Sequence, residues 1–436
     1  MPKPVCAIGL FLASLLLFGC TEKQVAIQPT PSPPPSPSPS PVAMPDDPVA
    51  KAQVKNYLEQ LNSKFPQGIW LQTMTQPLAE HDGSVSLSVA SITKVATALA
   101  ALQILGPDYR YTTEVWAGGP INNGVLQGDL IIKGGSDPLF IWEEAIPVGN
   151  MLNQLGIRQV TGNLVVVDRF HMNFEVSPVA SGELFKQAIN QQLWNSEVEL
   201  AHNSISGKPP QPMIEIRGRV RATNRLPPQA QLLLRHYSPP LIELVKKMNM
   251  YSNNPMAEVI AESIGGPGVI SQKSIQATGL PESEISIVNG SGLSDKNRIS
   301  ARAATAIFIS LAQFVESKGL TIADTMAIIG QDAGVLDWRK LPPQSVLKSG
   351  TLNTVSALGG VVPTKQKGLV WFTVINTGTV DDIDRYRKLQ DEFLTGLQEL
   401  WGKPDPLPSQ VRRTVINSNS RIDIIYPLGQ TSGPRQ

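Results

Sequence analysis

Hydrophobic spacing at the start of the folded part of the chain predicts a helix, a strand and a second helix. Apolar residues recur at helical intervals over residues 49–65, and the apolar run over 68–74 is typical of a strand. Residues 91–105 are rich in alanine and apolar on nearly every face of a helix, and Gly106 follows as a helix-ending residue. A helix without a polar face must be buried, so this helix is expected inside a domain.

The middle of the chain changes to strand-like patterns, and the last third returns to helices. Short β-rich runs over residues 109–236 are separated by glycine, asparagine and proline turns. Helical spacing resumes over 240–264 and 300–311, and an unbroken apolar strand is expected over 368–375. A final amphipathic helix, ending at Gly402, places five apolar residues on one side: Ile383, Tyr386, Leu389, Phe393 and Leu400.

This order predicts an α/β layer domain that is made from the two ends of the chain and interrupted by an insertion. Residues 49–112 and 240–402 are expected to form the first domain, and residues 113–239 a β-rich inserted domain. Residues 403–436 are a polar C-terminal tail that wraps the surface or remains loose.

The length and composition of the chain argue against several classes of function. With 436 residues, the chain is long enough for two or three domains and a sizeable core. The formal net charge of +1 gives no bulk field for nucleic acid or another polyanion. Cys6 and Cys20 are the only cysteines, and the four histidines lack metal-binding spacing. We therefore expect no metal, no other cofactor and no nucleic-acid partner.

Residues 1–19 have the features of an export signal. Lys3 precedes an apolar run over 7–18, which is too short to cross a bilayer as a helix. Residues 17–20 (LFGC) resemble a bacterial lipobox, which predicts that Cys20 carries a lipid and becomes the first residue of the mature chain. The alternative is an ordinary cleaved signal in which Cys20 is incidental.

Residues 20–48 are predicted to be a tether that follows the lipid-anchored cysteine. Ten prolines fall within residues 29–48, and proline both fixes φ and lacks an N–H, so the run favours extended polyproline II. At about 3.1 Å per residue, it could hold a domain up to roughly 60 Å from its anchor. A ligand for aromatic-groove domains is the alternative, but the neighbouring signal favours a spacer that keeps an enzyme near an extracellular substrate.

Two segments fit the pattern S-x-x-K, and their contexts separate them. Ser91 and Lys94 occupy positions i and i+3 of the predicted apolar helix, so their side chains face the same side. The second match, residues 345–348, lies between Pro343 and Gly350 in a strand-like stretch. About two matches are expected by chance in a chain of this length, so without partner motifs Ser91 would be a plain helix N-cap.

Two partner motifs follow in a definite order. Residues 252–254 (SNN) give S-x-N ahead of a helix, and residues 348–350 (KSG) give K-[ST]-G on an apparent strand. The trio is the signature of penicillin-binding proteins and serine β-lactamases. Asn253 and Ser349 stand where Asp and Thr are frequent, and both keep polar atoms in place. Five longer blocks resemble the D-alanyl-D-alanine carboxypeptidase/endopeptidase family of class C low-molecular-mass penicillin-binding proteins: ASITKVATALAALQILGPDYRYTTEV, GDLIIKGGSDP, MYSNNPMAE, NGSGLSDKNRIS and KSGTLNTVSALGG.

The resemblance implies a fold and a reaction. The fold is a serine β-lactamase/DD-peptidase-like transpeptidase domain, an antiparallel sheet packed with helices, interrupted by the β-rich inserted domain. The reaction is serine-type D-Ala-D-Ala carboxypeptidase action on peptidoglycan stem peptides through an acyl-enzyme on Ser91. Cross-link cleavage by endopeptidase action stays open as a second activity, and β-lactam antibiotics are the expected covalent inhibitors.

Acyl transfer needs a serine nucleophile and a base that activates it. Lys94 can serve as the base for Ser91 only when neutral, and bringing a lysine pKa from about 10.4 to near 7 requires about 4 to 5 kcal/mol. Burial and a second cation, Lys348, are expected to lower the pKa of Lys94. Ser252 is expected to relay a proton to the leaving D-alanine amine.

Substrate binding is expected from the second and third motifs. Asn254 would hold Lys94 and the substrate amide, and the backbone N–H groups of Ser91 and Thr351 would form the oxyanion hole. Lys348 and Ser349 would receive the terminal carboxylate of the peptide. The predicted substrate-binding residues are Asn254, Lys348, Ser349, Gly350 and Thr351.

Two other functions remain as alternatives. A serine β-lactamase shares the acylation residues but needs a dedicated water-activating base, and class A enzymes place the second motif much closer to the first. A non-catalytic peptidoglycan-binding lipoprotein would keep the fold alone, which three intact motifs argue against. The enzyme is expected in the periplasm or elsewhere outside the cytoplasm, with a lipid anchor in a membrane. The oligomeric state stays open.

Three remaining segments receive structural interpretations. Residues 289–292 (NGSG) are predicted to be a turn rather than a phosphate loop, and the resemblance leaves a role lining the catalytic groove as an alternative. Residues 134–138 are predicted to be a turn in the inserted domain. Trp371 and Phe372 are expected in the core.

Overall fold

The computed structural model describes residues 47–416 and 419–426. The predicted signal, Cys20 and nearly all of the predicted tether lie outside the described residues. Among the helices of the described part, none is both long enough and apolar enough to cross a membrane.

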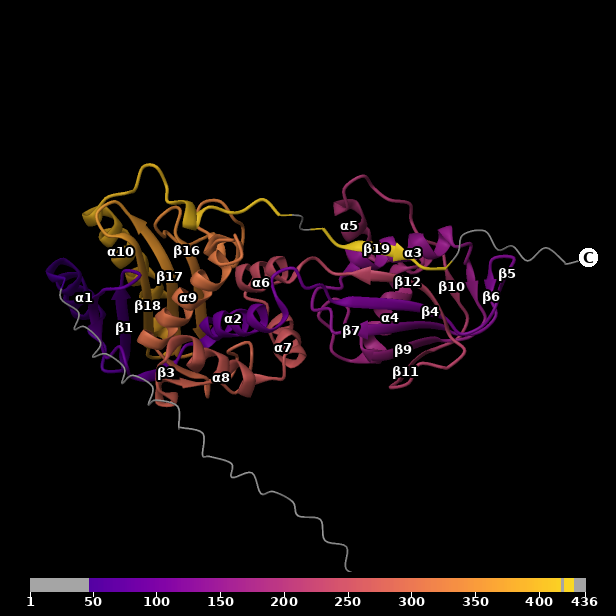
Figure 1. Cartoon of the computed structure of the whole chain (residues 1–436), viewed down its shortest axis with the longest axis horizontal. Coiled ribbons are helices and arrows are strands. Elements are labelled where there is room, and N and C mark those ends of the chain that lie inside the picture. The colour runs from indigo at the N-terminus through magenta and orange to yellow at the C-terminus, as the bar shows by residue number, and fades with distance from the viewer. Residues whose placement is uncertain (1–46, 417–418, 427–436) are drawn as a thin grey trace, which may run out of the picture. The chain divides into compact units, whose positions relative to one another are not determined.

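An antiparallel sheet of six strands is the frame of the part formed by the two chain ends (Figure 1). The strand order joins β1 from near the start of the chain to β18 from near its end, as the predicted interrupted domain requires. In sheet order the strands are β15 (Ala327–Ile328), β16 (Val346–Leu352), β17 (Val355–Thr364), β18 (Gly368–Thr377), β1 (Gln67–Gln72) and β2 (Pro77–His81).

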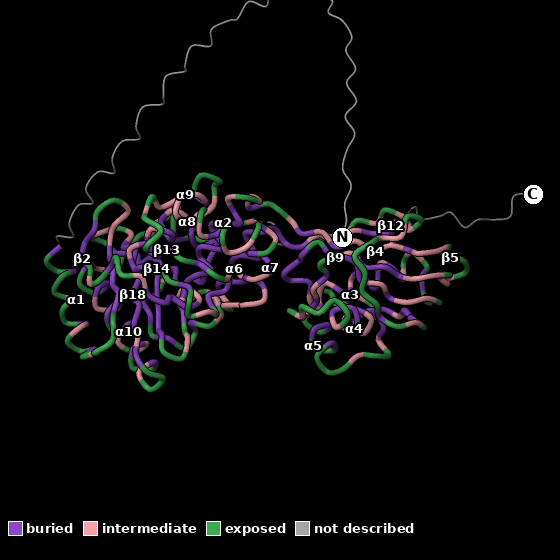
Figure 2. The backbone as a smooth tube through the Cα atoms, turned by 90° about the horizontal axis from the view of Figure 1, so that it is seen from below, coloured by how far each residue is buried: buried purple, intermediate pink, exposed green. Residues whose placement is uncertain are grey.

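Both faces of this sheet are covered by helices, which explains why its strands are apolar throughout. Trp371 and Phe372 are adjacent on β18 and therefore point to opposite faces, and both are buried, as predicted. Trp371 belongs to the core under α9 (Ala301–Glu316), whereas Phe372 packs in the core with α1 (Pro48–Leu61) and α10 (Ile383–Trp401). In Figure 2 the sheet is buried and the surrounding loops are exposed.

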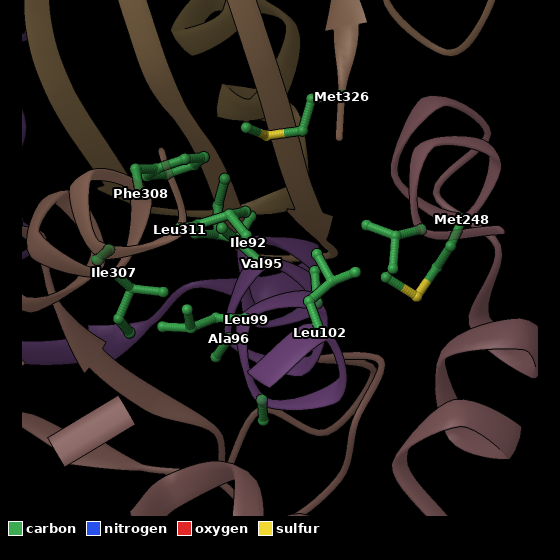
Figure 3. Close-up of a cluster of buried hydrophobic side chains, with 14 of the residues drawn as sticks. Ile92, Val95, Ala96, Leu99, Leu102, Met248, Ile307, Phe308, Leu311 and Met326 are labelled. Atoms are coloured by element: carbon green, nitrogen blue, oxygen red, sulfur yellow. The ribbon is translucent and has the colours of Figure 1, made fainter. Parts of the chain in front are cut away.

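The alanine-rich helix α2 (Thr93–Leu105) is buried at the centre of the first core, as predicted. Figure 3 shows apolar side chains from several elements gathered around it, among them Met248 and Phe308. Its neighbours α6, α8 and α9 help to bury every residue from Thr93 to Leu102, which is why this part of the helix lacks a polar side. Three helices complete this layer: α6 (Leu241–Met250), α7 (Asn254–Ser263) and α8 (Pro267–Thr278). A small antiparallel sheet of β13 (Ile285–Ser286), β14 (Arg298–Ser300) and β3 (Ser86–Ser88) lies beside them.

The inserted segment, residues 113–239, contributes to two further sheets and has a separate hydrophobic core that contains the paired rings of Phe140 and Phe170. The larger sheet has the order β11 (Val220–Thr223), β9 (Leu164–Arg169), β7 (Leu130–Gly135), β4 (Thr112–Ala117), β12 (Gln231–Tyr237) and β19 (Arg421–Ile424). The smaller has the order β10 (Glu215–Ile216), β8 (Gln159–Val160), β6 (Val125–Leu126) and β5 (Ile121–Asn122).

Three helices within the inserted segment were not predicted: α3 (Trp142–Gln154), α4 (Pro178–Ala188) and α5 (Ser196–Ser204). Strands β7, β9 and β11 are parallel neighbours, and such neighbours need crossover connections, which helices provide here. The segment is therefore a mixed α/β layer rather than a purely β-rich one.

Two predicted details of the last third are wrong. The helix predicted over 240–264 is divided at residues 251–253, where Ser252 adopts a left-handed φ of 52°. In α10, Leu400 is 48% exposed, whereas Leu397 and Trp401 provide the buried contacts of the last turns. Because an α-helix has 3.6 residues per turn, its buried face moves gradually around the helix axis. In the last turns this face contains Leu397 and Trp401, and Leu400 lies outside it.

The C-terminal segment was predicted to wrap the surface or to remain loose, and part of it forms a strand. Residues 421–424 form β19, which pairs antiparallel with β12 and so completes the larger sheet of the inserted segment. Arg413 contacts the carboxylate of Glu243 on α6 at 2.9 Å. The tail is therefore part of the described fold up to residue 426, apart from residues 417–418, which are not described.

Candidate active site

Ser91 lies in a single 3₁₀ turn, η1 (Ala90–Ile92), directly before α2. The predicted helix therefore starts two residues later than expected, because Ala90 adopts a left-handed φ of 48° that an α-helix does not allow. The turn leaves Ser91 partly exposed while Ala90 and Ile92 are buried. Strained backbone of this kind often presents functional side chains.

Lys94 is fully buried in the first turn of α2, and its amine faces Ser91. Nζ lies 2.8 Å from Ser91 Oγ, 2.7 Å from Asn254 Oδ1 and 2.7 Å from the carbonyl oxygen of Ser291. A neutral amine has two N–H donors and one lone pair. Since the amide oxygen and the carbonyl can only accept, they take both donors, and the lone pair is left for the hydroxyl of Ser91.

Burial lowers the pKa of Lys94 to about 7, and the carboxylate of Glu258 opposes part of this shift. An apolar surrounding disfavours the ammonium because it loses its hydration there. A large fraction of Lys94 is therefore neutral at neutral pH, which is the form that a general base requires.

Lys348 is the second buried lysine, and it comes from the middle of β16. Its Nζ lies 3.0 Å from Ser252 Oγ and 2.7 Å from the carbonyl oxygen of Ser349. Burial, and then the charge of Lys94, hold the pKa of Lys348 well below its ordinary value. Of the two causes expected to lower the pKa of Lys94, burial is the leading one, and the repulsion between the two amines acts on the pKa of Lys348.

The S-x-N motif forms the connection between α6 and α7. Asn253 caps α7 by accepting the backbone N–H of Met256 at 2.9 Å, so its amide has a structural role. Asn254 is the first residue of α7 and reaches Lys94. The left-handed Ser252 turns its hydroxyl to Lys348.

Gly350 allows β16 to pass directly behind Ser91. A Cβ atom at this position would lie 2.3 Å from the carbonyl oxygen of Val89 and 3.1 Å from the backbone nitrogen of Ser91. The first distance is far below van der Waals contact, so any larger residue would push the strand away from the serine turn. The glycine of the third motif is therefore required by the close approach of two backbones.

A cleft of about 430 Å³ opens over these residues. Five of the eight predicted site residues line it: Ser91, Ser252, Asn254, Ser349 and Thr351. The other three lie beneath its floor, since Lys94 and Lys348 are buried and Gly350 packs against the serine turn. The structure thus brings together all the residues predicted from the three motifs.

Sequence reasoning missed Glu258, and it described residues 289–292 only as a turn with an optional lining role. Glu258 accepts the backbone N–H groups of Ser291 at 2.9 Å and Gly290 at 3.1 Å. The same turn presents the carbonyl oxygens of Ser291 to Lys94 and of Gly290 to Thr97. The available signal was the position of Glu258 four residues after Asn254, which places both on one face of a helix.

In the part of the chain that the structure describes, no group of three or more His, Cys, Asp or Glu side chains could hold a metal ion. The groups that the cleft and its floor supply are hydroxyls, amines and backbone N–H groups. A helix-covered antiparallel sheet together with a serine hydroxyl in contact with a buried lysine amine is typical of active-site-serine acyl-transfer enzymes.

Comparison with known proteins gives the family. The model of the D-Ala-D-Ala carboxypeptidase 3 (S13) family matches residues 50–179 and 185–395. The chain belongs to this family and is a serine-type D-Ala-D-Ala carboxypeptidase that acts on peptidoglycan stem peptides. The predicted family, fold class and reaction are confirmed, and the cell-wall substrate puts the activity outside the cytoplasm.

Individual relatives are distant but cover most of the chain. D-alanyl-D-alanine carboxypeptidase DacB of Haemophilus influenzae is 22% identical over an alignment that is 435 residues long with its gaps. The alignment covers 76% of this chain and 90% of the relative. The crystal structure of penicillin-binding protein 4 from the same organism has a TM-score of 0.60 at 20% identity, covering 80% of this chain and 99% of that one. A penicillin G-acylated predatory endopeptidase from Bdellovibrio bacteriovorus has a TM-score of 0.68 at 22% identity, covering 80% of this chain and 96% of that one.

Proposed function

We propose that Ser91, Lys94 and Ser252 carry out the carboxypeptidase reaction with Lys348 as the proton source for Ser252, and that the other motif residues bind the peptide. The single observation that supports these roles is the setting of the Lys94 amine. It is buried, its two donors have acceptors in Asn254 and Ser291, and its lone pair is left for Ser91.

Acylation starts with neutral Lys94. The amine takes the proton of the Ser91 hydroxyl, and Oγ forms a bond to the carbonyl carbon of the penultimate D-alanine. The carbonyl oxygen becomes an oxyanion, which the backbone N–H groups of Ser91 and Thr351 stabilise. One such donor typically contributes about 10²- to 10³-fold in rate.

The tetrahedral intermediate then loses the terminal D-alanine. The carbon–nitrogen bond breaks, Ser252 gives its proton to the leaving amine, and Lys348 replaces that proton. The 3.0 Å contact between Lys348 Nζ and Ser252 Oγ supports this relay. At this stage Lys94 is protonated and Lys348 is neutral.

Hydrolysis of the acyl-enzyme reverses the two protonation states. A water molecule adds to the ester carbon and gives a proton to Lys348 through Ser252. The bond from carbon to Ser91 Oγ breaks, and Oγ regains its proton from Lys94. The free peptide acid leaves, and both lysines return to their starting states, so protons balance over the cycle.

The same acylation explains an expected sensitivity to β-lactams. A β-lactam presents a strained amide to Ser91, and ring opening keeps the leaving amine attached to the acyl group. The penicillin G-acylated relative supports this proposal. Rapid turnover of the drug would instead favour the β-lactamase alternative.

One experiment tests the proposal. Purified protein and its Ser91→Ala variant are incubated with a fluorescent penicillin and, separately, with a peptide ending in D-Ala-D-Ala. Stable labelling and release of D-alanine, both lost in Ser91→Ala, are the expected results. Fast penicillin hydrolysis without D-alanine release, or neither label nor release, would overturn the proposed function.

We also propose that Cys20 carries the lipid anchor, although it lies outside the described residues. The apolar run followed by LFGC supports this. Full-length protein produced in a bacterial host with labelled palmitate should incorporate the label, and Cys20→Ser should abolish incorporation. Unchanged incorporation in Cys20→Ser would contradict the lipid anchor.

A further inference from the structure

The cleft over Ser91 has a second wall that the three motifs do not provide. Arg387, from the second turn of α10, and Trp338, from the loop before β16, line the same cleft as Ser91 and Ser349. The Arg387 side chain is 24% exposed, so it is partly held in the wall and still faces solvent in the cleft.

Two contacts fix the guanidinium of Arg387. Its Nη2 donates to Thr351 Oγ1 at 3.2 Å, and the group lies 5.4 Å from the centre of the Trp338 ring. A guanidinium over an aromatic face is attracted to the ring and keeps its N–H groups free in the ring plane. Trp338 is 63% exposed, so its ring is an accessible apolar part of the cleft wall.

The positive charge of Arg387 is weakly compensated. Its Nη1 lies 2.8 Å from Asp384, but that aspartate side chain is 89% exposed, so water screens the pair strongly. The other arginine of this wall, Arg339, forms a buried pair with Asp391 at 2.7 Å. No carboxylate is among the described residues that line the cleft.

Lys348 is poorly placed to be the main partner of a substrate anion. It is buried below the floor of the cleft, and its amine is already in contact with Ser252 and the carbonyl of Ser349. The sequence predicted Lys348 and Ser349 as the partners of the terminal carboxylate; Ser349 lines the cleft, whereas the position of Lys348 favours another cation in this role. Arg387 is the cation that reaches the cleft beside the Ser349 and Thr351 side chains.

We propose that Arg387, oriented by Trp338 and Thr351, recognises the free carboxylate on the leaving side of the scissile bond and so determines specificity for substrates that carry this carboxylate over substrates in which it is an amide. Arginine binds carboxylates through two parallel N–H donors, which suits this anion. A neutral amide at the same position gains nothing from the cation. This inference rests on the proposed function, because it assumes that the peptide is bound with its scissile carbonyl at Ser91.

The test compares two peptides that differ only in their terminal group. Both are N-acylated L-Lys-D-Ala-D-Ala, one with a free carboxylate and one with a C-terminal amide. In Arg387→Gln, kcat/KM for the free acid should fall about 10- to 100-fold, mainly through KM, because a hydrogen-bonded ion pair is lost. The amide should change by less than about twofold, and Arg387→Lys should lie between wild type and Arg387→Gln on the free acid.

Lys388→Gln is the matched control. It removes one positive charge from the neighbouring position of α10, where the side chain is 77% exposed. Both peptides should be cleaved by this variant as by wild type. Equal losses on the two peptides in Arg387→Gln, or no loss on either, would overturn the proposal.

A binding measurement separates failure of this inference from failure of the proposed function. In the Ser91→Ala background, calorimetric titration should show tighter binding of the free acid than of the amide, and Arg387→Gln should remove that difference. If the wild-type chain released no D-alanine, the proposed function would fail, and the titration would still decide the role of Arg387. Equal affinity for both peptides before the Arg387 change would contradict it.

Discussion

Two buried groups of titratable side chains lie in different parts of the protein and have opposite designs. Near α2, the amines of Lys94 and Lys348 are two groups of the same kind, each surrounded by hydroxyl and carbonyl oxygens. In the inserted segment, His236 Nε2 lies 2.7 Å from Glu144, and Nδ1 lies 3.9 Å from Asp137. The second group combines opposite charges and packs under the ring of Phe140 at 4.9 Å.

The pKa values show what each design achieves. Burial raises the pKa of Asp137 to about 6, against the opposing charge of His236. Burial also acts on Glu144, but the hydrogen bond and charge of His236 outweigh it and lower the pKa of that carboxyl. In the second group, the contact with His236 stabilises the ionised carboxylate of Glu144. In the first group, one lysine amine is neutral and lies beside a serine that lines an open cleft. Burial of titratable side chains alone therefore does not create an active site. The lysine group differs from the histidine group because it lies beside a serine and under a cleft.

The largest test of this contrast replaces the base with a permanent cation. Lys94→Arg places a guanidinium in the cavity, and arginine cannot act as a base near neutral pH. Because general-base catalysis contributes about 10²- to 10⁴-fold, acylation by a fluorescent penicillin should slow by that factor. Lys388→Arg, an exposed change of the same type, should acylate normally. Acylation of Lys94→Arg within tenfold of wild type would show that Lys94 is not the base.

The next test moves the strand behind the serine. In Gly350→Ala, the added methyl group meets the carbonyl oxygen of Val89, so β16 must shift away from Ser91. A displacement of about 1 Å at a reacting group costs roughly 10²-fold, and we expect a loss of that order in kcat/KM for a D-Ala-D-Ala peptide. Gly396→Ala is the control, since its Cβ would meet only the end of the Gln53 side chain. Equal activity of the two variants would rule out the close-approach argument.

A smaller effect is expected from the charge that acts on Lys94. The carboxylate of Glu258 raises the pKa of Lys94, so Glu258→Gln should lower that pKa further below about 7. Since acylation needs the neutral amine, the acidic limb of the pH profile should move to lower pH. The maximal rate should fall about tenfold, because one clamp on the turn at residues 290–291 is lost. Glu262→Gln, exposed on the same helix, should leave the limb in place, and a shift to higher pH in Glu258→Gln would contradict the charge argument.

The smallest effect on activity is expected in the second group. His236→Gln leaves Glu144 and Asp137 without their imidazole partner, and a buried unpaired polar group costs about 1–3 kcal/mol. Thermal unfolding should therefore occur at a lower Tm, while kcat/KM below that temperature should stay within about twofold of wild type. His81→Gln, on a side chain that is 40% exposed, should change neither. Loss of activity in folded His236→Gln would remove the contrast between the two groups.

Much of the site could be predicted because its residues belong to short local motifs. The apolar period of α2 and the three motifs identify Ser91, Lys94, Ser252 and Lys348 without any knowledge of the fold. The clamp by Glu258 could not be predicted in this way, since its partners lie more than thirty residues away on a turn. Arg387 is even further from the motifs, and only the packing of α10 against β17 brings it to the cleft.

The fold shows the same limit. The hydrophobic patterns of the strands and helices at the two chain ends extend over enough residues to be recognised. The bounds of β18 and α10 were therefore predicted within a few residues. The break at Ser252 was missed because a left-handed serine has no local signal comparable with that of glycine. The strand β19 was missed because it is four residues long and its partner β12 lies far away in the sequence.

Pairing of β19 with β12 has a consequence for how the protein is completed during synthesis. Strand β12 is translated well before β19, so one of its edges has no partner until residues 421–424 have left the ribosome. An open edge of this kind is a template for pairing with other chains. A product that stops after α10 would keep every catalytic residue and still expose this edge, so the final residues protect the enzyme against aggregation rather than contribute to its chemistry.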